Sequence, residues 1–252
     1  MIRPSAIATA FRNGGLNEVG WRLWLQTRGL TPVVGQTRFN GIPTGDQTRL
    51  LDLVVKRWWT DQVRSNPTYE SALVAGLRAH VGVGERVVVV GGGHGVTAAV
   101  AAVAAGPGGH VDAFEAGDEM LPKIRRTLAA TGVDTTVTLH HAVVGAAHGV
   151  YGDTTAAVVA AGSLPACDVL VMDCEGAERE ILTDLARAEA RPRVLLVETH
   201  GIFGAPTADV RRLVEALGYT VTRDEIAESG LAEVCLRNDV RVLTALRTAP
   251  RP

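Results

Sequence analysis

The chain has 252 residues, a length that suits one α/β domain with an extension better than two small domains. Hydrophobic residues make up 46% of it and aromatic residues only 4%. This composition excludes a disordered protein and favours a parallel sheet covered by closely packed helices. The formal net charge is -2, from 25 Lys and Arg against 27 Asp and Glu, so no overall positive field attracts nucleic acid or an anionic membrane.

Neither the first residues nor the most apolar stretch resembles a targeting or membrane segment. Arg3, Arg12 and Glu18 interrupt the region where a signal peptide needs an apolar run. Val87–Val111 carries no Asp, Glu, Lys or Arg and is long enough to span a bilayer, but a glycine cluster between positions 91 and 95 interrupts it. The three cysteines form no C-x-x-C pair, which favours a reducing compartment. We therefore expect a cytoplasmic protein without membrane contact.

Residues 1–66 differ from the rest of the chain, because they hold all four tryptophans and lack a regular alternation of strands and helices. Val19–Leu25 and Asp46–Trp59 have the spacing of amphipathic helices. Pro, Gly and Asn breaks in Thr31–Pro43 indicate a short hairpin. We expect an N-terminal extension that covers the main domain or contacts a second copy in a homodimer.

Residues 67–252 show regular strand and helix units, which predict a doubly wound, mostly parallel, Rossmann-like α/β sheet. A closing pair of strands without a helix between them predicts an antiparallel hairpin at one edge, which makes seven strands. In such a sheet the ligand binds at the carboxyl ends of the strands. The predicted strands are 86–90, 110–114, 133–144, 168–173, 193–199, 219–222 and 233–237.

The strongest local signal is the run Val87-Val-Val-Val-Gly-Gly-Gly-His-Gly95, at the end of the first strand of this domain. Glycines here allow a tight turn and let the backbone approach a ligand at the start of a helix. We therefore expect Gly91, Gly93 and Gly95 to bind a cofactor, and His94 to contact its carboxylate. A glycine cluster that only lets helix and strand pack closely is the alternative.

Glu115 strengthens the cofactor interpretation, because it ends the second strand about 20 residues after the glycines. An acid at this place accepts the ribose hydroxyls of an adenosine cofactor. The alternative is that Glu115 caps the helix that follows. His141 lies on the third strand, where it can approach the adenine.

The glycine turn and Glu115 fit two cofactors. Gly93-His-Gly-Val-Thr-Ala98 satisfies G-x-G-x-x-A, the pattern of nicotinamide dinucleotide sites. S-adenosylmethionine needs the same ribose acid but no pyrophosphate site. These residues alone leave both cofactors open.

The segment Asp168–Leu182 contains the pattern D-x-E-G-x-E, in which Asp173, Glu175 and Glu178 are the acids. It resembles the FkbM-type family of S-adenosylmethionine-dependent methyltransferases, where this pattern ends the fourth strand and opens the next helix. The resemblance covers roughly Tyr69 to Val221 and implies the class I methyltransferase fold. Looser matches in the family's order are Tyr69-Glu70, Phe114-Glu115, Ala142-Val143, Glu198-Thr-His200 and Leu217-Gly-Tyr219.

The chain also departs from the family pattern. Val89 stands where the family usually has an acid, two residues before the first glycine, and Val171 stands where a lysine is common. The turn reads Gly91-Gly-Gly-His-Gly95 instead of G-A-N-x-G. These departures imply that the cofactor is held differently, binds more weakly, or that catalysis has been lost.

Asp173 and Glu175 lie at a strand's carboxyl end, where a carboxylate can orient the acceptor or take an alcohol proton. His200 ends the fifth strand and can serve as a general base or as a structural hydrogen-bonding group. For Glu178 we prefer the simpler interpretation of an acid favouring a helix N-terminus. We expect no metal, because Asp173 and Glu175 alone are too few ligands and Glu198 or His200 would have to converge on them.

The sequence thus predicts a methyltransferase that uses S-adenosyl-L-methionine, with an O-methylated small metabolite or sugar as product. Asp173, Glu175 and His200 face the hydroxylated acceptor in this prediction. An NAD(P)-dependent oxidoreductase and a non-catalytic protein of methyltransferase fold are the alternatives.

Overall fold

The computed structural model describes residues 20, 23–24, 27–54, 65–145, 154–187 and 191–248. The chain forms two compact units. The smaller unit comprises residues 1–38 and 46–66, and the larger one comprises residues 39–45 and 67–252. None of the helices in the described ranges has the length and apolar character needed to cross a bilayer.

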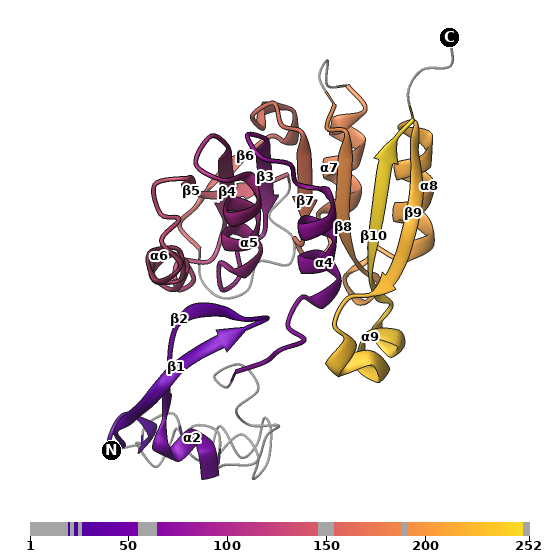
Figure 1. Cartoon of the computed structure of the whole chain (residues 1–252). Helices are drawn as coiled ribbons and strands as arrows, with labels where there is room; N and C mark the ends of the chain where they lie inside the picture. Colours follow the sequence, from indigo (N-terminus) through magenta and orange to yellow (C-terminus); the bar gives the residue numbers. More distant parts are fainter. Residues whose placement is uncertain are drawn as a thin grey trace. The chain divides into compact units, whose positions relative to one another are not determined.

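An eight-stranded sheet forms the centre of the larger unit, in the order β6-β5-β4-β3-β7-β8-β10-β9 (Figure 1). Neighbouring strands from β6 to β8 are parallel, whereas β10 is antiparallel to both β8 and β9. This order, with one antiparallel strand next to the edge, is the Rossmann-like fold of class I methyltransferases, so the predicted fold class is confirmed. The strands are β3 (Arg86–Val90), β4 (His110–Glu115), β5 (Val137–Val144), β6 (Ala157–Val159), β7 (Val169–Met172), β8 (Val194–His200), β9 (Tyr219–Ile226) and β10 (Val240–Arg247).

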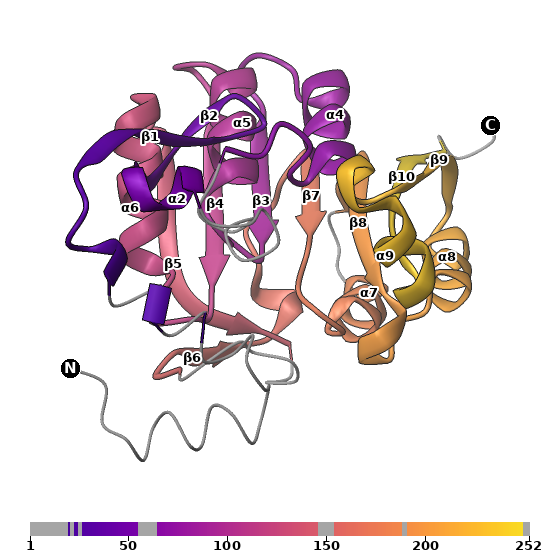
Figure 2. The same ribbon diagram turned by 90° about the horizontal axis from the view of Figure 1, so that it is seen from below.

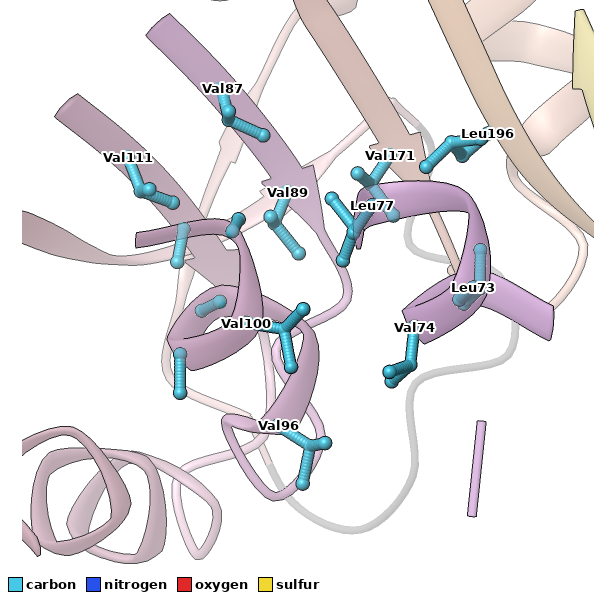
Figure 3. Close-up of a cluster of buried hydrophobic side chains, with 14 of the residues drawn as sticks. Leu73, Val74, Leu77, Val87, Val89, Val96, Val100, Val111, Val171 and Leu196 are labelled. Atoms are coloured by element: carbon cyan, nitrogen blue, oxygen red, sulfur yellow. The ribbon is translucent and has the colours of Figure 1, made fainter. Parts of the chain in front are cut away.

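Helices cover both faces of this sheet (Figure 2). Alternate residues of the buried strand β3 point to opposite faces: Val87 and Val89 pack with α4 and α5, and Val88 and Val90 pack on the α7 and α8 side. The first of these clusters is shown in Figure 3. The helices are α4 (Ser71–His80), α5 (Val96–Ala105), α6 (Leu121–Thr131), α7 (Glu178–Leu185), α8 (Thr207–Ala216) and α9 (Ala232–Asn238).

The hairpin predicted within Thr31–Pro43 is confirmed, but it is longer than expected. It consists of β1 (Val33–Phe39) and β2 (Ile42–Arg49), followed by the short helix α2 (Leu50–Val54). The predicted helix from residue 46 is therefore wrong as far as residue 49, because pairing with β1 outweighs the local helical pattern. Residues 55–59 of that prediction, and most of the helix predicted over 19–25, lie outside the described residues.

The closing strand predicted over 233–237 is wrong, because these residues lie in helix α9 and the strand β10 begins at Val240. Val234 and Leu236 are 48% and 58% exposed, and Cys235 between them is buried. A helix therefore does separate the last two strands. The short edge strand β6 was not predicted, and it makes the sheet eight-stranded instead of seven-stranded.

Candidate functional site

The candidate site lies at the carboxyl ends of β3, β4, β7 and β8. The chain order reverses there, because β3 is followed along the chain by β4 on one side and pairs with β7 on the other. Doubly wound sheets bind their ligands at such a point. The glycine turn after β3, Glu115 at the end of β4 and Asp173 after β7 all lie at this edge.

The turn after β3 is held tightly against the end of β7. Gly91 has a φ of 92°, and a Cβ atom there would overlap the carbonyl oxygen of Asp173. The backbone N–H of Asp173 donates to the carbonyl of Val90 at 2.9 Å. Gly93 and Gly95 also have positive φ, at 47° and 80°. The glycines therefore serve the turn itself, and whether they also serve a cofactor stays a prediction.

Glu115 binds the glycine turn through its side chain. Its Oε2 accepts the backbone N–H groups of Gly92 at 2.9 Å and Gly93 at 3.0 Å, and its Oε1 accepts that of Gly117 at 2.6 Å. An ionised carboxylate has about four lone-pair positions. Three of them are engaged by amides in this way, and the remaining capacity is what a ribose hydroxyl could use.

The two histidines assigned to the cofactor have neighbours of their own. The ring of His94 makes edge contacts with Phe39 and Tyr69, at centroid distances of 5.0 and 5.8 Å. His141 is in register with Glu115 on the neighbouring strand, and its Nε2 lies 2.8 Å from Oδ1 of Asp118. Both histidines therefore border the site edge.

A cluster around His200 is the most constrained part of the site. Nδ1 of His200 lies 2.8 Å from Oε1 of Glu178, and Nε2 lies 3.5 Å from Oδ1 of Asp173. Nε2 also lies 3.6 Å from Oε1 of Glu198, two residues earlier on β8. His200 is 6% exposed and Glu198 9% exposed. Asp173 and His200, both predicted to face the acceptor, thus lie next to each other, and their catalytic role stays a prediction.

Glu178 has a larger part than the sequence suggested. It is fully buried, and besides contacting His200 it accepts the backbone N–H groups of Cys174 at 3.3 Å and Gly176 at 2.9 Å. A role at the helix N-terminus alone therefore does not account for its contacts. Glu178 organises the loop after β7 and orients the imidazole of His200. Its place in the D-x-E-G-x-E pattern was the available signal.

Glu175 lies in the loop between β7 and α7 and has a left-handed backbone with a φ of 51°. Burial, followed by the nearby charge of Asp173, raises the pKa of Glu175 to about 7. A half-buried side chain in a sparsely populated backbone region is held there by its surroundings. Its side chain was predicted to face the acceptor, and this stays a prediction.

Tyr69 and Glu70 also belong to this edge, although no role in the site was expected for them. They precede α4, and the phenolic oxygen and Oε1 come within 3.4 and 3.5 Å of the position a Cβ on Gly93 would take. Glu70 has a φ of 47°, and its Oε2 is buried without a hydrogen-bond partner among the described residues. Their match to the family segment was the overlooked signal.

The site carries more acids than bases. Burial raises the pKa of Asp173, Glu70 and Glu198, and the charge of Asp173 raises the pKa of the other two further. Burial lowers the pKa of His200, but the hydrogen bond to Glu178 and the charge of Asp173 outweigh this and raise it. Each acid therefore disfavours the ionised form of its neighbours, and a cation bound at this edge would relieve that repulsion.

Val89 and Val171, the two departures from the family pattern, are fully buried in the apolar cluster of Figure 3. They are paired directly in register between β3 and β7. An acid at one position and a lysine at the other would lie side by side. Because both charges are absent, neither position leaves an unpaired buried charge.

No model of a known protein family matches the chain. A search of curated protein sequences gave no match either.

Solved structures share part of the fold at low identity. Precorrin-6y C5,15-methyltransferase from Geobacter metallireducens is 18% identical, with 71% of this chain and 86% of that chain covered and a TM-score of 0.49. The O-methyltransferase TomG from Streptomyces achromogenes, in complex with S-adenosylmethionine, is 19% identical, with 71% of this chain and 79% of that chain covered and a TM-score of 0.46. An S-adenosylmethionine-dependent O-methyltransferase from Thermotoga maritima is 19% identical, with 74% of this chain and 67% of that chain covered and a TM-score of 0.49.

Proposed function

We propose that the protein is an S-adenosylmethionine-dependent methyltransferase that methylates the hydroxyl group of a small acceptor. The observation that carries this proposal is the excess of carboxylates around the glycine turn at the switch point of the sheet. Asp173, Glu70 and Glu198 act on one another there, and His200 is the basic group among them. A crevice of this kind favours a cofactor with cationic sulfonium and ammonium groups.

The same observation argues against the nicotinamide alternative. A dinucleotide brings a pyrophosphate with two negative charges to the helix that follows the glycine turn. Glu115 already occupies the N–H groups of Gly92 and Gly93, which are amides that a phosphate would need. The acids at the edge would repel the pyrophosphate further.

The residues present fit S-adenosylmethionine in three respects. Glu115 keeps hydrogen-bonding capacity for a ribose hydroxyl. The glycine turn presents backbone next to the end of β7, and the acids supply a negative surface for the cationic groups. We assign His94 to the cofactor carboxylate and His141 to the adenine side. When bound, the cofactor supplies a methyl group on a positively charged sulfur.

The acceptor would be held by the groups around His200. Nε2 of His200 and Oδ1 of Asp173 lie 3.5 Å apart, so a hydroxyl beside both atoms can hydrogen-bond to each of them. Alignment and exclusion of water account for much of the rate of such a displacement. The acceptor proton leaves toward a carboxylate of this edge, for which Glu175 is the half-buried candidate.

Isothermal titration of the purified protein with S-adenosylmethionine, its demethylated product and NAD tests the proposal. We expect the two S-adenosyl compounds to bind and NAD to give no heat of binding. Binding of NAD alone would support the oxidoreductase instead. Absence of binding by all three to a folded protein would support a non-catalytic protein of methyltransferase fold.

A further inference from the structure

Three side chains at the edge of the sheet converge in a way that hydrogen bonding does not explain. One oxygen each of Asp173 and Glu198 and one ring nitrogen of His200 all lie within 4.8 Å of one another. Asp173 follows β7 and the other two residues end β8, so two adjacent parallel strands set their positions.

The two separations that involve His200 match the spacing of ligands around a metal ion. Nε2 of His200 lies 3.5 Å from Oδ1 of Asp173 and 3.6 Å from Oε1 of Glu198. Both distances are too long for good hydrogen bonds. Ligand atoms at the corners of a tetrahedron around Zn²⁺ stand about 3.3–3.6 Å apart when the bonds are about 2.0–2.2 Å long.

Glu178 completes the arrangement of a metal-binding histidine. It lies 2.8 Å from Nδ1 of His200 and is fully buried. A carboxylate that accepts the N–H of one ring nitrogen leaves the lone pair on the other nitrogen, here on the side of Asp173 and Glu198. This is the outer hydrogen bond that metal-ligating histidines usually make.

Glu198 supplies an independent sign that a cation belongs here. The residue is 9% exposed, and its Oε2 is buried without a hydrogen-bond partner in the described part of the chain. Burying a carboxylate oxygen without a partner is unfavourable, and a bound cation would compensate for it. Glu70, which also acts on Asp173, leaves a second buried carboxylate oxygen unpartnered.

We propose that Asp173, Glu198 and His200 bind a divalent transition-metal ion of the Zn²⁺ type, with Glu178 as the outer hydrogen-bond partner of His200. Two carboxylates and one imidazole form a mixed oxygen and nitrogen ligand set, which suits Zn²⁺ better than Mg²⁺. Three protein ligands leave a coordination position open, as catalytic sites do.

The ion site stands on its own geometry, whereas its use in catalysis rests on the proposed function. In a methyltransferase the open position would take the acceptor hydroxyl and favour its deprotonated form. His200 would then be a ligand and not the general base considered from the sequence, and the proton would still leave toward Glu175. The sequence prediction of a metal-free site rested on too few converging ligands, and the fold adds Glu198 and His200 to Asp173.

Binding of Zn²⁺ and of Co²⁺ to the chelator-treated full chain tests the site without any cofactor or acceptor. We expect one ion per chain, a rise in the melting temperature on adding Zn²⁺, and the visible absorption of tetrahedral cobalt with Co²⁺. Glu198→Gln should weaken ion binding at least 100-fold, and Glu178→Gln should weaken it about 10–100-fold. Glu180→Gln, an exposed acid on the same helix as Glu178, is the matched control and should bind normally.

Thermal unfolding gives a second readout, because the difference in stability between Glu198→Gln and the wild type should change sign when the ion is added. Without the ion, Glu198→Gln should be at least as stable as the wild type, because the amide removes a buried charge. With Zn²⁺ the wild type should become the more stable protein. If the folded wild type binds no ion, or if Glu198→Gln binds it as tightly, the proposal is overturned. The outcome is separate from that of the cofactor titration, so either proposal can fail alone.

Discussion

Glu178 holds His200 from a position that solvent does not reach. Oε1 of the glutamate lies 2.8 Å from Nδ1 of the imidazole, and the same carboxylate accepts the backbone N–H groups of Cys174 and Gly176. One side chain thus joins the loop after β7 to the end of β8. The candidate site and the fold therefore depend on the same buried contact.

The first prediction concerns this contact. Glu178→Ala leaves two backbone N–H groups and a ring nitrogen without their acceptor, so it should lower the free energy of unfolding by about 2–4 kcal/mol. Glu180→Ala, two residues further along the same helix, should change it by less than about 0.5 kcal/mol. Urea unfolding followed by circular dichroism measures both. Equal effects of the two substitutions would show that Glu178 has no structural role.

The second prediction separates backbone strain from steric overlap in the glycine turn. Gly91 and Gly84 have positive φ angles of 92° and 85°, but only a Cβ on Gly91 would overlap the carbonyl of Asp173. Gly84→Ala should cost about 1–2 kcal/mol for the left-handed backbone alone. Gly91→Ala should cost at least about 2 kcal/mol more, because backbone atoms must move. Similar melting temperatures for the two variants would contradict the packing of the turn against β7.

Much of the larger unit is readable from its sequence because its strands are buried on both faces. Strand β3 (Arg86–Val90) has the predicted limits, since β-branched runs and glycine breaks act locally. Helix α9 and strand β10 were misassigned, because a short run such as Glu233–Arg237 has no decisive period. Tertiary pairing with β8 and β9 decides where the last strand lies.

The residues of the candidate site could be predicted from the sequence only in part. Asp173 and His200 could be named from their places at strand ends, because parallel strands bring their carboxyl ends to one edge. Glu198 and His200 are two residues apart on β8 and so share a face. That Glu178 points at His200 depends on where the loop after β7 places the start of α7, which the sequence does not contain. The local pattern favoured the weaker interpretation of Glu178 for the same reason.

The third prediction tests Glu115 as the ribose acceptor. Glu115→Gln keeps an oxygen that can accept the turn amides of Gly92 and Gly93, but it loses the negative charge. Affinity for S-adenosylmethionine should fall by roughly 1.5–3 kcal/mol, the scale of a charge-assisted hydrogen bond. Calorimetric titration measures this, and the melting temperature without ligand controls for damage to the turn. Unchanged affinity in a folded variant would reduce Glu115 to a structural acid.

The fourth prediction concerns acid stability. Asp224 of β9 accepts a hydrogen bond from Arg211 of α8 at 2.6 Å and another from Arg241 of β10. Burial raises the pKa of Asp224, but the hydrogen bonds from Arg241 and Arg211 outweigh it, and the pKa lies below its ordinary value. Its contribution to stability is therefore complete above the unfolded pKa of about 3.9 and is lost as the pH falls through the lower folded pKa.

Asp224→Asn should accordingly destabilise the protein by about 1 kcal/mol at neutral pH. Between about pH 5 and pH 2 its stability should depend less on pH than that of the wild type. Asp184→Asn, which removes an exposed pair with Arg187, should behave like the wild type. Urea unfolding at a series of pH values provides the comparison, and parallel curves for Asp224→Asn and the wild type would contradict the prediction.

The last prediction concerns Asp173, where the sequence pattern and the geometry meet. Its backbone N–H is bound to Val90 and its side chain is 22% exposed, so the nearly isosteric Asp173→Asn should keep the fold. The variant should lose methyl transfer by a factor of about 10² or more, whether the carboxylate orients the acceptor directly or through a bound ion. Transfer of labelled methyl from S-adenosylmethionine to hydroxylated acceptors measures this, with the exposed Asp134→Asn as control. Wild-type turnover by a folded Asp173→Asn protein would remove the residue from the reaction, and the acids of this edge would then serve binding alone.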